Sequence, residues 1–284
     1  MDVSPRIGVI EDPRFQDHEE PAHHPEAAAR LVAVRHAVEA VCQVQPDAFQ
    51  RFEPSHASDD DILRVHTGDH LRGVEAAVKQ APTQLDADTY VSRESFDVAR
   101  LAAGSCVDLA MKIAAGEIDC GFAALRPPGH HAESGHAMGF CLFNNVAIAA
   151  RALQQHAGIE KVLILDWDVH HGNGSQHSFE SDPSILYMST HQFPFYPGTG
   201  AAGEVGLGMG AGATLNVPMP EGCGDFEYIG VMQHLIAPAA LEFDPDFILV
   251  SCGFDAHAAD PLGSMEISAA GFRAMTQIVQ EVAN

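Results

Sequence analysis

Positive charge is scarce in this chain of 284 residues. It has 15 lysine and arginine residues against 39 aspartate and glutamate residues, which gives a formal net charge of −24 at pH 7. A protein that binds a nucleic-acid backbone needs a basic stripe to neutralise the phosphates, and so few cations do not supply one. We therefore expect no nucleic acid among its partners, and we interpret the acidic surface mainly as a source of solubility.

Paired cysteines and long apolar runs are also missing. The six cysteines show no C-x-x-C spacing, so we expect reduced thiols rather than a disulfide framework. No apolar run approaches the roughly 20 residues that a membrane-spanning helix needs. The N-terminal residues lack the charged-then-apolar pattern of a signal peptide. These absences predict a soluble, cytoplasmic protein without a membrane partner.

Short apolar runs alternate with alanine-rich helical patterns along the chain. The apolar runs of strand length lie at residues 6–10, 120–125, 161–166, 185–190 and 247–252. The helical patterns lie at residues 25–41, 95–116, 144–158 (with Asn144 or Asn145 as N-cap) and 225–241. Strands that are apolar throughout, with helices between them, indicate a parallel sheet covered on both faces. We predict a doubly wound α/β fold with its ligands at the carboxyl ends of the strands.

Polar loops follow three of these strands directly. The strand at 120–125 leads into "RPPGHHAESGHAMGF", the strand at 161–166 into "WDVHHGNG", and the strand at 247–252 into "GFDAHAADPLG". Because the carboxyl ends of parallel strands meet at one rim of a sheet, three such loops predict an active site there.

A metal site is the first hypothesis for this rim. Asp166, Asp168 and His170 are two residues apart, and they would project to one side if strand geometry continued. Asp168 and His170 can hold one metal ion, and Asp255 from the third loop can close the set. Two carboxylates and one imidazole leave an open position on a zinc-sized ion, which is typical of a catalytic site. Singly, each is more readily explained as a hydrogen-bonded loop residue; jointly, the adjacent acids need a cation or a proton.

Two adjacent histidines form the second feature. His130 and His131 follow "RPPG", and such a pair near a metal suggests a general base with a general acid or electrostatic partner. Each imidazole needs an acceptor that orients its far nitrogen. Asp166 is a candidate for one histidine and Asn173 for the other.

Five stretches together resemble the histone deacetylase superfamily: "RPPGHHA", "GFCLFNNVAIAA", "DWDVHHGNGSQHSF", "HQFPFYPGTG" and "SCGFDAHAADPLG". The resemblance extends over nearly the whole chain. It is greatest to the class II enzymes and their bacterial homologues, which include acetylpolyamine amidohydrolases and acetoin-utilisation proteins. It implies the arginase/deacetylase fold, a single deacetylase domain over residues 1–284, a zinc ion and hydrolysis of an acyl amide.

The resemblance also implies roles for individual residues. Asp168, His170 and Asp255 resemble the zinc ligands, and His130 and His131 resemble the tandem catalytic pair. Asp166 then corresponds to the partner of His130, and Asn173 to the partner of His131, where asparagine is the class II choice. A potassium ion close to the zinc is also implied, at Asp166, Asp168, His170, Ser189 and Thr190.

The substrate channel is implied in the same way. Gly139 and Phe140 resemble one wall of an acyl-lysine channel, and Tyr196 resembles the opposite wall. The expected partner is therefore an acetylated lysine in a peptide or protein, or a small acetylated amine, and self-association into a homo-oligomer stays open. Polyamine-selective relatives have a glutamate in a "DP-x-G" loop where this chain has Leu262. We therefore expect acyl-lysine to be preferred over acetylpolyamine.

Three other readings compete with a zinc deacetylase. A binuclear manganese ureohydrolase is disfavoured because Gly172 and His257 stand where its second metal needs carboxylates. A non-catalytic acyl-lysine binder stays open, because the family's oxyanion donor is a tyrosine in a loop beyond one further strand, and Asn284 precedes it. We expect a C-terminally incomplete domain without its last strand, whose activity is weaker by roughly a hundred- to a thousandfold. A metal-stabilised structural domain ranks last because it gives the adjacent histidines no role.

Overall fold

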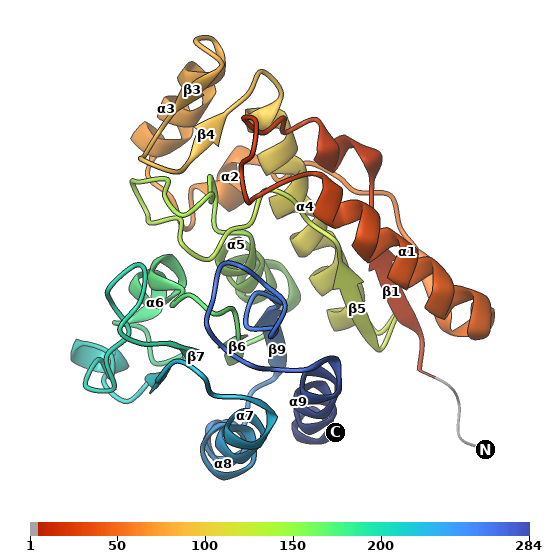
Figure 1. The fold of residues 1–284 in the computed structure, drawn as a ribbon, viewed down its shortest axis with the longest axis vertical. Coiled ribbons are helices and arrows are strands. Elements are labelled where there is room, and N and C mark those ends of the chain that lie inside the picture. Colours follow the sequence, from red (N-terminus) through yellow and green to blue (C-terminus); the bar gives the residue numbers. More distant parts are fainter. Residues whose placement is uncertain (1–4) are drawn as a thin grey trace. The chain divides into compact units, whose positions relative to one another are not determined.

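Parallel strands lie at the centre of both units into which the chain divides, Met1–Gly158 and Ile159–Asn284. The computed structural model describes residues 5–284, and Figure 1 traces the elements in chain order. Each unit has its own sheet and its own buried apolar cluster. The prediction of an α/β fold with parallel sheets flanked by helices is confirmed. A single domain over residues 1–284 stays a prediction.

The sheet of the first unit has the strand order β2–β1–β5, with bounds β1 (Ile7–Ile10), β2 (Phe49–Arg51) and β5 (Cys120–Ala123). β1 is parallel to both neighbours, and Ile7 pairs with Cys120. The long helix α4 (Ser95–Ala114) packs on β1 and β5, and its Leu109 lies in one apolar cluster with Ile10. The loop with the adjacent histidines therefore leaves the carboxyl end of a parallel strand, as the sequence predicts.

The other elements of the first unit are α1 (Ala29–Val44), α2 (Asp59–Ile62), α3 (Gly68–Val78), the β3–β4 hairpin (Thr83–Gln84 and Tyr90–Val91), α5 (Asn145–Ala152) and 3₁₀ turns at Pro13–Gln16 and Pro46–Ala48. Asn144 caps α5, because its side chain accepts the backbone N–H of Ala147 at 3.1 Å. A π-helical turn (Leu153–Ala157) continues α5 to Gly158, whose φ of 69° ends it. The predicted helix start is confirmed at Asn144.

The sheet of the second unit has the order β8–β7–β6–β9, with bounds β6 (Val162–Asp166), β7 (Ile185–Gln192), β8 (Thr214–Met219) and β9 (Phe247–Ser251). All neighbouring strands are parallel, and Asp166 pairs with Ser189 on one side and Ser251 on the other. β6 ends at Asp166, so the expectation that strand geometry continues through Asp168 and His170 is wrong. The chain bends there instead, and the bends bring the polar groups together.

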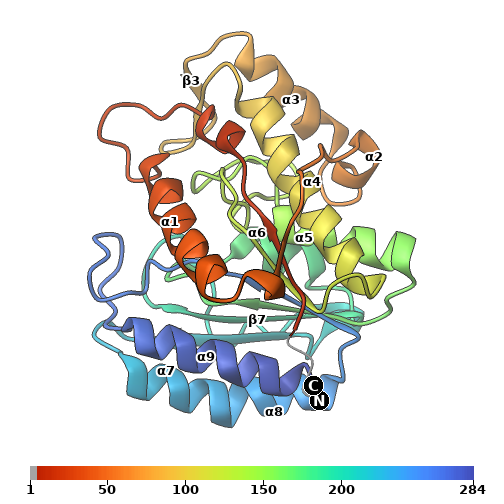
Figure 2. The same cartoon turned by 90° about the vertical axis from the view of Figure 1, so that its right-hand side faces the viewer.

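Helices cover this sheet. They are α6 (Asn173–Phe179), α7 (Asp225–Val231), α8 (Ala237–Phe243), which a π-helical turn (Met232–Ile236) joins to α7, and α9 (Ala269–Val282). α7 and α8 follow one another end to end through the π-helical turn, and α9 runs beside them along one face of the sheet (Figure 2). Leu165 and Met188 from the strands share a buried cluster with Met232 and Met275 from the helices. This packing fixes the strand ends that carry the polar loops.

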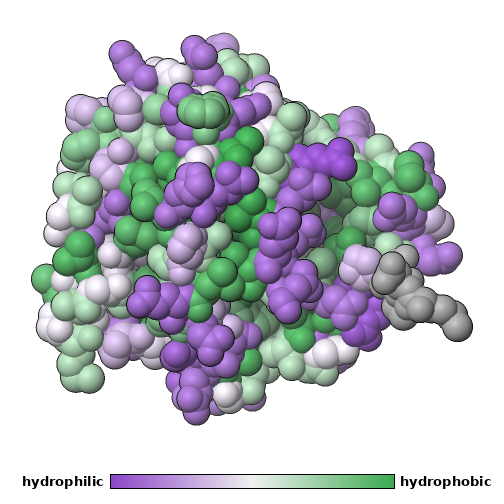
Figure 3. Space-filling view, turned by 90° about the horizontal axis from the view of Figure 1, so that it is seen from below, coloured by the Kyte–Doolittle hydropathy of each residue, from purple (hydrophilic) through white to green (hydrophobic). Residues whose placement is uncertain are grey.

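Apolar and polar side chains alternate over much of the surface. Figure 3 shows apolar groups between hydrophilic ones on the face seen from below. Phe226, Leu235 and Leu241, from the α7–α8 segment, are exposed. Within residues 5–284, no helix combines the length and the apolar character that crossing a membrane requires.

Candidate functional site

Asp168, His170 and Asp255 lie close together in the second unit. One ligand atom from each lies within 4.8 Å of the other two. His170 Nδ1 is 3.1 Å from Asp168 Oδ1 and 3.0 Å from Asp255 Oδ2. The structure therefore brings the three predicted metal ligands together, although β6 and β9 place them on separate loops.

Short hydrogen bonds along the chain explain how the loop after β6 forms this cluster. The backbone N–H of Asp168 donates to Asp166 Oδ1 at 3.3 Å, and that of His170 donates to Asp168 Oδ1 at 2.9 Å. Such contacts from a carboxylate to a backbone group two residues on are typical of turns formed by aspartate. Asp255 Oδ1 also accepts the N–H of Val169 at 2.8 Å, which ties the β9 loop to the β6 loop.

Gly253 makes the approach of the two loops possible. A Cβ atom at Gly253 would meet the carboxylate of Asp168, with the carboxyl carbon only 2.7 Å away. Any other residue would therefore displace Asp168. The glycine directly before the "FD" of the third loop has a steric role in the cluster.

The pKa shifts of His170 and Asp255 show that two carboxylates share one imidazole as their positively charged partner in this cluster. Burial, and then the charge of Asp168, raise the pKa of Asp255 to about 6. Burial alone would lower the pKa of His170, but its hydrogen bonds to Asp168 and Asp255 and their charges outweigh burial and raise it to about 10. Two acids and an imidazole with such values are poised to share a proton or to bind a cation. The donor set of two carboxylates and one imidazole fits a zinc ion.

Aromatic rings stand beside His170. The ring of Phe195 is stacked on it, with centroids 5.4 Å apart and planes at 17°, and Tyr196 meets it edge-on at 6.0 Å. Tyr196, the predicted channel wall, is therefore near the cluster. Phe195 was not predicted from the sequence, although the run of aromatic residues in "FPFY" could have indicated it.

Asp166 is fully buried at the end of β6 and accepts a hydrogen bond from the Tyr187 hydroxyl at 3.3 Å. Asn173 is the first residue of α6 and is also buried. Ser189 on β7 is hydrogen-bonded to His191 at 2.9 Å, whereas the hydroxyl of Thr190 has no partner among the described residues. The potassium site implied for Asp166, Ser189 and Thr190 stays a prediction.

The adjacent histidines belong to the first unit. His130 and His131 are buried, and their ring centroids are 4.0 Å apart. Gly139, with φ of 56°, packs directly against the His131 ring, and Phe140 meets the His24 ring edge-on at 5.0 Å. Gly139 thus lies beside the histidine pair. The pairing of Asp166 with His130 and of Asn173 with His131 stays a prediction.

Two further histidines hold the loop that carries His130 and His131. His66 accepts the N–H of Asn144 at 2.9 Å through Nε2 and donates through Nδ1 to the carbonyl of Glu133 at 2.9 Å. His70 donates through Nε2 to the carbonyl of Leu142 at 2.8 Å. His66 and His70 could not be predicted from the sequence, because no spacing links them to the later loop.

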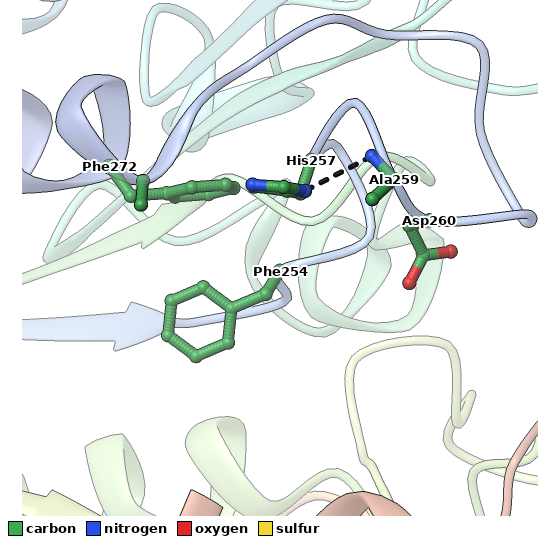
Figure 4. A pocket seen from close by; sticks show the side chains of 6 residues that line it. Phe254, His257, Ala259, Asp260 and Phe272 are labelled. Atoms are coloured by element: carbon green, nitrogen blue, oxygen red, sulfur yellow. Dashed lines mark hydrogen bonds between the residues drawn. The ribbon is translucent and has the colours of Figure 1, made fainter. Parts of the chain in front are cut away.

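A hollow of about 460 Å³ lies at the loop after β9. Figure 4 shows Phe254 and Phe272 among its lining residues, with His257 hydrogen-bonded to the backbone of Ala259. His257 accepts that N–H at 3.1 Å, at the position where a second metal would need a carboxylate. Leu262, which stands where polyamine-selective relatives are expected to have a glutamate, is half-buried in the same loop, and its N–H donates to Asp260 at 2.9 Å.

Comparisons with known proteins agree with this geometry. The model of the histone deacetylase domain matches residues 24–284. "Histone deacetylase 15" from Arabidopsis thaliana is 45% identical over 263 residues, which cover 91% of this chain and 47% of that protein. A "Probable deacetylase" from Archaeoglobus fulgidus is 39% identical over 268 residues, which cover 94% of this chain and 74% of that protein.

Solved structures give the same result. The crystal structure of the HDA15 HD domain superposes with a TM-score of 0.94 at 43% identity, covering 99% of this chain and 80% of that one. The chain spans 44–47% of the length of three of its plant and fungal relatives. A family match over most of the chain, with the three predicted ligands in one cluster, settles the classification. The chain belongs to the histone deacetylase family.

Proposed function

We propose that this chain is a zinc-dependent deacetylase that hydrolyses the amide bond of acetyl-lysine in a peptide or protein. The observation that carries the proposal is the Asp168–His170–Asp255 cluster within a histone deacetylase domain. The names of its relatives support the reaction class, since they are histone deacetylases and a probable deacetylase.

The three clustered side chains would hold the zinc ion, because their donor atoms fit the ligand set of a catalytic site. When bound, the ion would supply Lewis acidity at the scissile carbonyl and at a water molecule. Gly253 keeps the Asp168 carboxylate in place, and Val169 orients Asp255 through its N–H. These contacts are what a ligand set needs to keep its geometry.

His130 and His131 are proposed to handle the protons of the reaction. Hydrolysis removes a proton from the attacking water and delivers one to the amine that leaves, and a buried imidazole pair can do both. His66 and His70 support this role, because they fix the loop on which the pair stands. Asp166 and Asn173 are the proposed partners that orient the two imidazoles.

The lysine stem is proposed to lie between aromatic walls. Tyr196 and Phe195 stand beside His170, so an apolar stem passing them would bring its amide to the ligand cluster. Gly139 and Phe140 are the proposed opposite wall. Leu262 offers no carboxylate to a second ammonium group, which favours acetyl-lysine over acetylpolyamine.

A turnover panel tests the proposal. The purified chain is offered an acetyl-lysine peptide and acetylspermidine, first with a chelator and then with added zinc. We expect acetate release from the peptide to stop with the chelator, to return with zinc, and to exceed release from acetylspermidine. Asp168→Ala should abolish zinc retention and turnover, whereas Glu242→Gln, an exposed charge change on α8, should alter neither. Full zinc occupancy with unchanged turnover in Asp168→Ala would contradict the ligand assignment.

A further inference from the structure

A long loop, residues 193–213, connects β7 to β8 and carries the aromatic pair beside His170. Its helical part is a 3₁₀ turn at Gly208–Gly210, and turns, bends and irregular backbone make up the rest. Backbone hydrogen bonds from Phe193, Leu207 and Gly212 hold the loop at those points, and side-chain hydrogen bonds help to hold residues 199–204 between them. Since Phe195 and Tyr196 stand in this loop, whatever holds the loop also sets where these two rings lie beside His170.

Glu204 holds the loop from inside. Its carboxylate accepts the backbone N–H of Gly200 at 3.0 Å and that of Ala201 at 3.0 Å. The second carboxylate oxygen accepts the side-chain amide of Gln176 at 2.8 Å. One half-buried side chain thus closes the turn that follows the aromatic pair and links that turn to α6.

Gln176 connects Glu204 to His171, which lies in the same loop as Asp168 and His170. Because its NH₂ group donates to Glu204, its carbonyl oxygen must face the other way, where it lies 2.9 Å from His171 Nε2. Asn216 on β8 donates to the same oxygen at 2.6 Å. The carboxylate of Glu204 therefore fixes the amide orientation, and the amide orientation makes His171 Nε2 the donor.

The other ring nitrogen of His171 contacts the loop that carries Phe195 and Tyr196. Its Nδ1 lies 2.8 Å from the hydroxyl of Thr199. Gly200, with φ of 90°, lies between the rings of His171 and His191, where a Cβ atom would strike both. His191 donates to the carbonyl of Gly200 at 2.9 Å. The hydrogen bonds form a closed circuit from Glu204 through Gln176 and His171 back to the loop.

We propose that Glu204 is a positioning residue, which acts through Gln176 and His171 to hold the Phe195–Tyr196 wall against His170. The inference rests on the proposed function, because it assigns the wall to substrate binding. Loss of the carboxylate should therefore weaken binding of the acetyl-lysine stem more than it slows the chemical step.

Glu204→Gln is the first variant. Its amide would place an NH₂ group against the NH₂ group of Gln176, so one of the two amides must turn and lose its partners. The double variant Gln176→Glu with Glu204→Gln exchanges the two groups and restores an acceptor opposite a donor. Glu221→Gln, an exposed change of the same charge in the same unit, is the control. If Glu204→Gln does not fold, Gln176→Asn replaces it, since the shorter side chain breaks the same link.

Steady-state kinetics with an acetyl-lysine peptide give the first readout. We expect Glu204→Gln to raise KM about tenfold, the scale of one lost charge-assisted hydrogen bond, with kcat within about threefold of the wild type. The double variant should recover most of that loss, and Glu221→Gln should match the wild type. Equal KM values in Glu204→Gln and the wild type would overturn the proposal, as would a fall in kcat alone.

Hydrogen–deuterium exchange gives a readout that does not depend on activity. Amides in residues 193–213 should exchange faster in Glu204→Gln, while those of β6 and β9 keep their wild-type rates. Faster exchange throughout the second unit would show a merely structural role and overturn the proposal, and so would unchanged exchange in the loop. If the wild-type chain hydrolyses no acetyl-lysine peptide, the proposed function fails separately, and exchange still decides whether Glu204 positions the loop.

Discussion

Gly253→Ala is the substitution whose effect on the ligand cluster follows most directly from the structure. The added methyl carbon would lie 2.7 Å from the carboxyl carbon of Asp168, whereas ordinary contact begins at 3.4 Å. The Asp168 carboxylate must therefore retreat by at least about 0.7 Å (3.4 − 2.7), and by more at the oxygen that lies nearer to the added methyl carbon. Because φ at Gly253 lies outside the left-handed region, backbone strain adds nothing to this effect.

The size of the retreat sets the expected loss of zinc affinity. Ligand distances in a working metal site vary by only about 0.2 Å, so a retreat of this size should weaken the bond from Asp168 to the ion without removing the ligand. Changes next to a ligand typically cost about 10- to 100-fold in metal affinity. We expect zinc to bind Gly253→Ala within this range of weakening, or about 1.4 to 2.7 kcal/mol.

Competition with a chromophoric chelator measures the zinc affinity, and elemental analysis after dialysis measures the retained zinc. Gly230→Ala is the matched control, because a Cβ atom there meets open space within α7. It should leave zinc affinity unchanged and stabilise the helix by up to about 1 kcal/mol. A folded Gly253→Ala that binds zinc within threefold of the wild type would refute the steric reasoning.

Three further predictions concern stability and are measured by urea unfolding. Arg126→Met should lower the free energy of unfolding by about 3–5 kcal/mol, because it removes the buried cation 2.7 Å from the fully buried carboxylate of Glu26 and leaves that carboxylate with the Tyr90 hydroxyl and the more distant Arg30, at 3.7 Å; adding Glu26→Gln should restore part of the loss, and a loss of the same size in the double variant would contradict this account. Burial, helped by His70, lowers the pKa of His66 to about 3 from 6.5. The unfolded state therefore binds the extra proton between those values, and wild-type stability should fall by about 2 kcal/mol more than that of His66→Gln between pH 7 and pH 5; parallel pH profiles would exclude it. Tyr228→Phe should raise the free energy of unfolding by about 1 kcal/mol, because the buried hydroxyl has no partner among the described residues, and a clear loss would mean that it has one.

The helices and strands that could be predicted from the sequence are those whose apolar run or N-cap residue lies within a few neighbouring residues. The apolar runs at 161–166 and 247–252 form strands whose residues are buried or partly buried, and Asn144 caps α5 because its side-chain oxygen accepts an N–H only three residues along the chain. β8 was missed, because "TLNVPM" is interrupted by asparagine and proline and lacks the continuous apolar pattern. α1 begins at Ala29 rather than at the predicted residue 25, and it has no side-chain cap to mark its start.

The residues of the candidate site also differ in whether the local sequence could predict them. Asp168, His170 and Asp255 could be predicted because their chemistry is unusual at the ends of apolar strands. Gly253 and Glu204 could not, since their roles depend on contacts between loops that no local pattern encodes. The strand geometry considered for Asp168 and His170 does not continue past Asp166, and local turns bring the two residues together instead.

The parallel pairing of β1 with β5 has a consequence for how the first unit is made. Ile7 pairs with Cys120, so β1 waits for 113 further residues before this neighbour exists. At about 5–20 residues per second, that wait on a ribosome is roughly 6 to 23 s. During that time Val9, buried in the finished unit, has only β2 to pair with, and Ile10, also buried, lacks its partner Ala123 on β5. Contacts so distant in sequence slow folding. Before β5 has been synthesised, the nascent N-terminal half therefore needs chaperone protection.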